Sequence, residues 1–369
     1  MKKADRAFVG TRKGLFVLER KGAALSVART CFLGAQVSFA MVDPRDGAVH
    51  VALKHGHFGA KMHRSNDGGA TFEEMAAPAF PPKPEGLVDV DPMRKTERKW
   101  SVELIWSLAT GAARGELWLG TIPGGLFRST DSGASWALVR SLWDHPARAK
   151  WFGGGYDSPG IHSIAVDPTN PKRVYVGVSC GGVWLSEDGG ETWSVRATGM
   201  KAEYMPPDKA GDPEIQDPHR VVMCAAAPEV MWCQHHSSAY RSVNGGASWE
   251  ELTALSPSRF GFAVACSPHD KDTAWFVPAI KDEVRLPVDG KMVVARTTDG
   301  GKTFETMWRG LPQEHAYDLV YRHGLDVDDT GGSLIMGSTT GSLWTSSDGG
   351  ESWDTVSHHL PPIYSVCWG

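Results

Sequence analysis

One eight-residue phrase occurs six times along this chain of 369 residues and constrains its fold more than any other feature. Each copy begins with Ser or Thr, has Asp or Asn third and Gly fifth, and ends in Trp or Phe; the copies occupy residues 65–72, 129–136, 186–193, 242–249, 297–304 and 346–353. The third side chain can accept hydrogen bonds from backbone N–H groups of a tight turn, and the glycines supply positive φ angles. The phrase therefore predicts six similar β-hairpins that each return an aromatic ring to the core.

The copies start 49 to 64 residues apart, which is the length of four short strands with their connections. Residues 161–168, 173–177, 182–186 and 192–195 provide the clearest set of strands A to D, with β-branched residues alternating between turn residues. By this template, strands of type A begin near 37, 101, 161, 219, 260, 315 and 362. The prediction is an all-β, seven-bladed β-propeller that forms a single domain over residues 1–369.

The first blade is predicted to combine both ends of the chain. Residues 5–28 match strands B and C of the later blades, but no segment before them can serve as strand A. Residues 362–369 supply the missing pattern, so the C-terminal strand should pair with the N-terminal blade and close the ring, with blades two to seven within residues 36–357. Closure of this kind removes an exposed sheet edge, which would otherwise invite aggregation.

The eight-residue phrase resembles the Asp box of BNR-repeat propellers. Residues 56–59, 152–157, 216–220 and 315–323 add a resemblance to bacterial proteins described as exo-sialidase-like or glycosyl-hydrolase-like, whose activity is uncertain. The resemblance implies a saccharide-active or saccharide-binding propeller. Sialidases carry an early Arg-Ile-Pro element, whereas the similar string here, at residues 285–287, falls in blade six and reads Arg-Leu-Pro. A sialidase-like glycoside hydrolase without that element stays one alternative.

Long insertions are expected on one face of the ring. Residues 76–100, 141–159, 198–217 and 280–291 all fall in D-to-A or B-to-C connections, which emerge on the same side of a propeller. Long loops in compact domains are usually functional or disordered. This decorated face is therefore the predicted location of the binding site.

Polar residues at the starts of A strands and the ends of B strands should converge on that face, and histidine is frequent among them. The candidate catalytic residues are His162, His219, His236, His315, Tyr204 and Glu203. The candidate substrate-binding residues are His57, Trp106, Asp217, Gln234, His235, Arg259, Phe262, Lys281, Glu283, Arg285 and Tyr317. Among these, the cationic side chains at 259, 281 and 285 suit an anionic group of the substrate.

Imidazoles that meet near a ring axis can bind a divalent metal ion or move protons near neutral pH. His162, His219 and His236 form the predicted metal trio, since adjacent blades would bring them together. The alternative is that these rings only bond to backbone carbonyls and water; in that case no cofactor is expected. Two function classes follow: a hydrolase or lyase with a histidine-rich pocket for a small molecule or saccharide, or a noncatalytic scaffold that binds a protein partner.

The overall composition limits the classes of binding partner that are expected. The formal net charge of −5, without a run of Lys or Arg, leaves nothing to neutralise a phosphate backbone, so nucleic acid is not an expected partner. No apolar stretch approaches transmembrane length and no polybasic anchor is present, so a membrane is not expected either. Six cysteines follow neither a metal-binding spacing nor the repeat. These features suggest a cytoplasmic protein.

Overall fold

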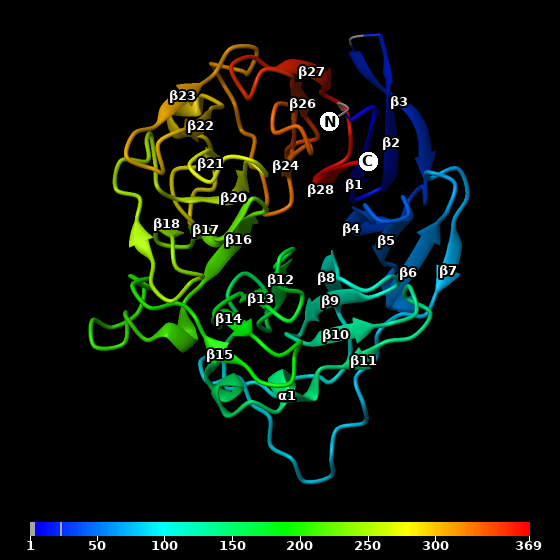
Figure 1. The fold of residues 1–369 in the computed structure, drawn as a ribbon, viewed down its shortest axis with the longest axis vertical. Helices are drawn as coiled ribbons and strands as arrows, with labels where there is room; N and C mark the ends of the chain where they lie inside the picture. The colour runs from blue at the N-terminus through cyan, green and yellow to red at the C-terminus, as the bar shows by residue number, and fades with distance from the viewer. Residues whose placement is uncertain (1–3, 23) are drawn as a thin grey trace.

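Seven four-stranded antiparallel sheets stand around a common axis in the computed structural model, which describes residues 4–22 and 24–369 (Figure 1). The sheet order is β28-β1-β2-β3 for the first blade, and each later blade follows the chain in sequence order from its inner to its outer strand. The predicted seven-bladed all-β propeller is confirmed. Among the described residues, helix is limited to α1 (Arg140–Trp143) and four 3-10 turns, η1 (Gly56–Phe58), η2 (Pro146–Lys150), η3 (Pro213–Ile215) and η4 (Val288–Gly290).

The strand bounds, blade by blade, are as follows. Blades one to three contain β28 (Ile363–Trp368), β1 (Arg6–Thr11), β2 (Gly14–Lys21) and β3 (Ala24–Cys31); β4 (Gln36–Val42), β5 (Val49–Lys54), β6 (Ala60–Ser65) and β7 (Glu73–Met75); and β8 (Leu104–Thr110), β9 (Leu117–Ile122), β10 (Leu126–Ser129) and β11 (Ala137–Leu138). Blades four and five contain β12 (Ile161–Val166), β13 (Val174–Val178), β14 (Gly182–Ser186) and β15 (Ser194–Val195); and β16 (Pro218–Cys224), β17 (Ala227–His235), β18 (Ala239–Ser242) and β19 (Glu250–Glu251). Blades six and seven contain β20 (Gly261–Cys266), β21 (Ala274–Pro278), β22 (Val294–Thr297) and β23 (Glu305–Met307); and β24 (Leu325–Val327), β25 (Leu334–Gly337), β26 (Leu343–Ser346) and β27 (Asp354–Ser357).

The two ends of the chain close the ring together. Strand β28 pairs antiparallel with β1, with Ala7 opposite Trp368 and Gly10 opposite Ser365. Figure 1 places the N and C labels side by side at the junction of blades one and seven. Closure by the C-terminal strand is therefore confirmed.

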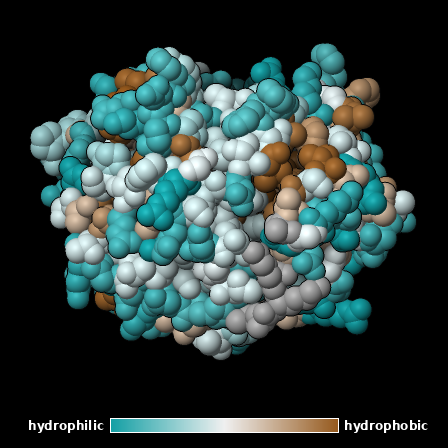
Figure 2. Space-filling view, turned by 90° about the horizontal axis from the view of Figure 1, so that it is seen from above, coloured by the Kyte–Doolittle hydropathy of each residue, from teal (hydrophilic) through white to brown (hydrophobic). Residues whose placement is uncertain are grey.

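The hydrophobic core lies between neighbouring sheets. Each blade interface contains large side chains with almost no exposed surface, among them the indoles of Trp118, Trp184, Trp232, Trp275 and Trp344. Seen from the rim in Figure 2, the surface is mostly hydrophilic and its apolar atoms form small separate patches. None of the helices within residues 4–22 and 24–369 is long and apolar enough to cross a bilayer.

The six repeated turns share one hydrogen-bond pattern, seen clearly in blade four. The hydroxyl of Ser186 accepts the backbone N–H of Gly190 at 2.7 Å and donates to Asp188 at 2.7 Å. Asp188 in turn accepts the backbone N–H groups of Glu191 and Thr192. The bond from a glycine N–H to the first hydroxyl recurs at Ser65, Ser129, Ser242, Thr297 and Ser346. The repeat thus specifies a turn in which a buried hydroxyl satisfies a buried amide.

Replacement of that hydroxyl should cost stability. Ser186 is fully buried, so Ser186→Ala leaves the N–H of Gly190 without a partner and is expected to lower the free energy of unfolding by about 1 to 3 kcal/mol. Urea denaturation measures this difference. Ser194→Ala, at an exposed position of β15, is the matched control and should change stability by less than about 0.5 kcal/mol. Equal stabilities of the two variants would contradict this account of the turn.

The last blade departs from the sequence prediction. Its inner strand, β24, begins at Leu325, whereas strand A was predicted to begin near residue 315. His315 instead lies in the preceding connection, exposed and with a left-handed φ of 54°. Residues 308–324 form a long irregular connection. Its apolar residues, such as Leu319 and Val320, are buried, so the sequence there has the pattern expected of a buried strand.

Candidate active site

A large cavity lies on the axis of the ring, on the face that carries the long connections. Its volume is about 990 Å³, and every blade contributes to its wall. Three of the four predicted insertions supply wall residues, at 152–156, 203–204 and 280–285. The fourth, residues 76–100, supports the wall from behind: its Asp91 accepts the backbone N–H of Gly153 at 2.8 Å. The cavity thus occupies the place where the loop lengths predicted a site.

A repeated irregularity of the inner strands aims side chains at this cavity. Six of the seven inner strands contain a shift in pairing register near their start, as a β-bulge produces. The bulged residues are Ser38, Trp106, His162, His219, Phe262 and Tyr364. All of them except His162 line the cavity. Bulges re-aim side chains, and here five of the six bulged residues reach the axial cavity.

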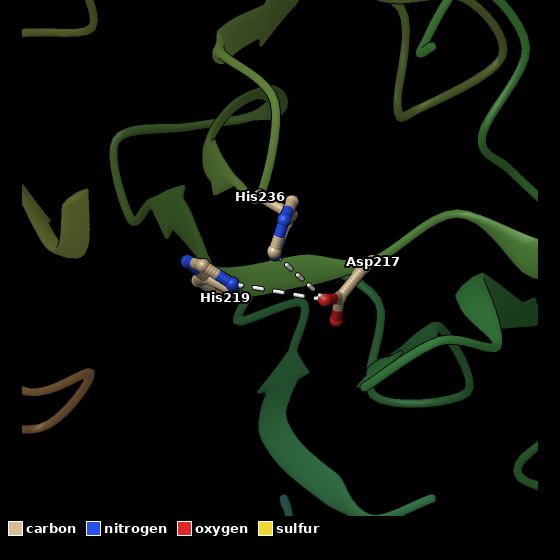
Figure 3. A group of neighbouring side chains, drawn as sticks. All are labelled: Asp217, His219 and His236. Atoms are coloured by element: carbon tan, nitrogen blue, oxygen red, sulfur yellow. Dashed lines mark ion pairs between the residues drawn. The ribbon is translucent and has the colours of Figure 1, made fainter. Parts of the chain in front are cut away.

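Blade five brings three potential metal ligands together. In the antiparallel pair of β16 and β17, Pro218 lies opposite His235, so the residues flanking this pair, Asp217 and His236, meet at the end of the strands. The bulge at His219 turns its ring to the same point. Figure 3 shows Asp217, His219 and His236 converging, and one potential ligand atom from each lies within 4.8 Å of the others.

The carboxylate of Asp217 is oriented by its neighbours. Its Oδ1 accepts the hydroxyl of Ser179 at 3.2 Å and the backbone N–H of Cys180 at 3.1 Å, both from the turn that follows β13. Its Oδ2 faces the two histidines, 3.7 Å from Nε2 of His219 and 3.4 Å from Nδ1 of His236. Two atoms that bind one ion at about 2.1 Å are themselves roughly 3 to 3.5 Å apart. The separation from His236 lies within this range, and the separation from His219 exceeds it slightly, so a small movement of the His219 ring would complete a shared site.

The ring of His219 is held in one tautomer. Its Nδ1 lies 2.7 Å from the carbonyl oxygen of Gly261, and because a carbonyl can only accept, Nδ1 carries the proton and donates it. The Nε2 lone pair then points toward Asp217. The ring also stacks on Phe262, with centroids 4.3 Å apart. A backbone carbonyl on the far nitrogen is the usual outer partner of a metal-binding histidine.

The electrostatics of the cluster favour ionised Asp217. Burial alone would raise the pKa of this carboxyl, but the hydrogen bond from His236 and the positive charge of Arg322 hold the pKa well below its usual range. Burial lowers the pKa of His219, so its ring is held neutral. For His236, burial opposes protonation, yet the neighbouring Asp217 raises its pKa. An ionised carboxylate beside a neutral imidazole is a donor set for a divalent cation.

Most of the predicted site residues line the cavity. These are Trp106, Glu203, Tyr204, Asp217, His219, His236, Arg259, Phe262, Lys281, Glu283 and Arg285. The ring of Tyr204 stands edge-on to that of His236, with centroids 4.9 Å apart. Burial raises the pKa of Tyr204, so its hydroxyl stays protonated near neutral pH and can donate a hydrogen bond.

His162 does not join the predicted metal trio. It is fully buried beneath Trp106, with ring centroids 5.4 Å apart, and its Nδ1 lies 2.9 Å from the hydroxyl of Ser163. The indole of Trp106 covers it, and the described residues that could share a cation are Asp217, His219 and His236. The ligand set that the structure brings together thus replaces His162 with Asp217, and all three members come from one blade rather than from adjacent blades.

The other predicted residues lie outside the cavity wall. Gln234 and His235 are buried in β17; Gln234 donates to three carbonyls, and Nε2 of His235 accepts the backbone N–H of Asp217 at 3.0 Å. His235 therefore positions Asp217. His57 is exposed on η1, and His315 and Tyr317 are exposed on the connection before β24.

Several wall residues were not among the predicted site residues. Tyr156, Tyr321, Arg322, His323 and Tyr364 all line the cavity. The imidazole Nε2–H of His323 donates to the backbone carbonyl of His162 at 2.7 Å and so joins opposite parts of the ring. Residues 321–323 had been quoted as part of a family-like phrase. The phrase at residues 315–323 was the available signal. It indicates these wall residues only if the inner strand of blade seven begins ten residues later than predicted.

Comparisons with known proteins bear on this site. A scan against models of known protein families found no match. A xyloglucanase from Paenibacillus sp is 23% identical over 269 residues, which cover 63% of this chain and 24% of the relative. A probable oligoxyloglucan-reducing end-specific xyloglucanase from Neosartorya fischeri is 30% identical over 281 residues, or 68% of this chain and 30% of the relative. This chain therefore spans less than a third of the length of either curated relative.

A solved structure shows the same fold. The GH74 xyloglucanase from Xanthomonas campestris superposes with a TM-score of 0.66 over 99% of this chain and 52% of that chain, at 18% sequence identity. At this identity the likeness establishes the propeller architecture alone. The resemblance to the exo-sialidase-like family and the cytoplasmic location stay predictions.

Proposed function

We propose that this protein is a saccharide-active hydrolase or lyase that works with a divalent metal ion at Asp217, His219 and His236. The observation that carries the proposal is the convergence of these three side chains in the wall of the axial cavity. Three protein ligands leave coordination positions open, which is typical of catalytic rather than structural metal sites. The relatives that bear xyloglucanase names support a saccharide as the ligand.

Each element of the cavity has a chemical role in this proposal. A divalent ion bound there supplies Lewis acidity and lowers the pKa of a bound water. Ser179, Cys180 and His235 hold Asp217 in place. The hydroxyl of Tyr204, beside His236, stays protonated and donates a hydrogen bond to a substrate oxygen. The exposed aromatic rings of Tyr156 and Tyr204 in the wall give the sugar ring an apolar face to lie on.

The test is turnover of a saccharide panel by protein loaded with Zn²⁺ or Mn²⁺. Release of reducing ends reports hydrolysis or elimination, and ultraviolet absorbance of an unsaturated product reports elimination alone. We expect that chelation by EDTA removes activity and that Asp217→Asn reduces kcat/KM by about 100-fold or more, because the neutral amide binds a cation weakly but keeps the bonds to residues 179 and 180.

Two outcomes contradict the proposal. Turnover that survives both EDTA and Asp217→Asn would move the reaction away from the cluster. Failure to turn over any panel member, with tight binding of a protein partner instead, would favour the noncatalytic scaffold.

A further inference from the structure

Arg322 is a cationic side chain of the cavity wall to which no carboxylate of the described residues is paired. It precedes β24, and no hydrogen bond or ion pair holds its guanidinium among residues 4–22 and 24–369. Its Nε is buried and unsatisfied. A guanidinium carries five N–H donors, so one in a partly buried place without an acceptor needs an explanation.

The other cations of the cavity already have carboxylate partners. Arg259 pairs with Glu251, Lys281 with Glu283 at 3.6 Å, and Arg285 with Asp282 at 2.5 Å. Arg322 therefore differs from every other Lys or Arg of this wall. Its charge is the one left uncompensated by direct contact.

Two aromatic rings hold the guanidinium of Arg322 in place. Its Cζ lies 4.8 Å from the ring centroid of Trp106 and 5.2 Å from that of Phe262, in cation–π contact with each. The backbone beside it is equally constrained, because the N–H of Gly324 donates to the carbonyl of Tyr321 at 2.8 Å. Cation–π contact with these rings holds the guanidinium in place, and its N–H groups stay available for an acceptor.

Desolvation makes an anion the natural complement of this group. Burial lowers the pKa of Arg322 although Asp217 and Tyr156 oppose the change. Its charged form thus lacks water on its aromatic faces and gains from an anion at its edge. Around it, Tyr156 lies edge-on to Trp106 at 5.2 Å, and Tyr321 stacks with Tyr364 at 6.3 Å. The cavity therefore combines aromatic surfaces for a sugar ring with one rigid cation.

We propose that Arg322 binds the carboxylate of an acidic saccharide, so that the substrate is built from uronic acid units. A carboxylate matches the planar fork of a guanidinium with two parallel hydrogen bonds, which a hydroxyl of a neutral sugar cannot make. This inference rests on the proposed saccharide-active function and specifies its substrate class. Arg322 is assigned a role in binding and orientation, next to the cluster where reaction is proposed.

The experiment compares binding of D-glucuronate and of its neutral methyl ester, by isothermal titration, with and without EDTA. We expect native protein to bind the free acid at least about tenfold more tightly than the ester. The preference should disappear in Arg322→Gln and weaken in Arg322→Lys, whose ammonium lacks the fork. Arg114→Gln, at an exposed arginine outside the cavity wall, is the matched control and should keep the preference.

Each outcome has a distinct meaning. Equal binding of acid and ester, or an unchanged preference in Arg322→Gln with a native near-ultraviolet circular dichroism spectrum, would overturn the inference. Inorganic phosphate that competes as tightly as glucuronate would also overturn it, since the site would then accept any oxyanion. A preference that persists in EDTA while metal uptake and turnover are absent would support Arg322 and refute the proposed metal-dependent reaction.

Discussion

A chain that lacks residues 360–369 is expected to lose the stable ring. The deletion removes β28, whose Ile363, Val366 and Trp368 are buried against blades one and seven. Burial of three such side chains contributes about 5 to 9 kcal/mol, which is comparable with the whole stability of an ordinary domain. It also exposes the edge of β1. Soluble yield and thermal unfolding followed by circular dichroism measure the effect.

A circular permutant provides the control for this deletion. It joins the two natural ends by a flexible linker and opens the chain at Gly86, which is exposed in the 76–100 connection. All contacts of β28 are retained, so the permutant should fold with nearly native stability, whereas the truncated chain should aggregate. A truncated protein with native solubility and melting temperature would contradict closure of the ring by β28.

A His219→Ala variant is expected to lose divalent-metal binding. The variant removes one of three ligand atoms, and since loss of an outer partner alone costs about 10- to 100-fold in metal affinity, loss of a ligand should cost at least about 100-fold. Isothermal titration of metal-stripped protein with Zn²⁺ and with Mn²⁺ measures this affinity. His236→Ala, at a less buried position, should give the same loss with less risk to folding.

The control for metal binding is His57→Ala. This histidine is exposed on η1 and lies outside the cavity wall, so its loss should leave affinity and stoichiometry unchanged. Equal reductions of metal affinity in His57→Ala and His219→Ala would indicate nonspecific binding by surface histidines. That result would contradict a metal site at Asp217, His219 and His236.

The fold was predictable because its signals are local and repeated. A hydroxyl such as that of Ser186, an Asp two residues later and the glycines between strands specify each turn without reference to the rest of the chain. Six such turns at a spacing suited to four strands leave few arrangements other than a closed ring. The missing inner strand of blade one then had a single candidate, at the other end of the chain.

The site was predictable only in outline. Chain order placed His219 and His236 at the ends of adjacent strands, and that placement brought them together. Whether a bulged side chain reaches the cavity depends on its neighbour, however: His219 lies against Phe262 and reaches the wall, whereas His162 is covered by Trp106. Burial of this kind is set by packing between blades, which no local pattern encodes.

Arg322 is a second residue whose place in the cavity could not be predicted from local sequence patterns. The strand that follows it, β24, was predicted to begin ten residues too early, because the connection that contains Arg322 also has buried apolar residues in a strand-like pattern. The lack of a carboxylate partner, which makes this residue informative, is a property of the assembled cavity. A sequence shows which charges exist but not which of them remain unpaired.

The most direct test of the metal proposal is an anomalous-difference map from crystals soaked in Zn²⁺ or Mn²⁺, recorded at the absorption edge of the ion. The account predicts one strong peak in the axial cavity, within bonding distance of Asp217 Oδ2 and of a ring nitrogen from both His219 and His236. A map without a peak among these three side chains, from crystals that contain the ion, would contradict it.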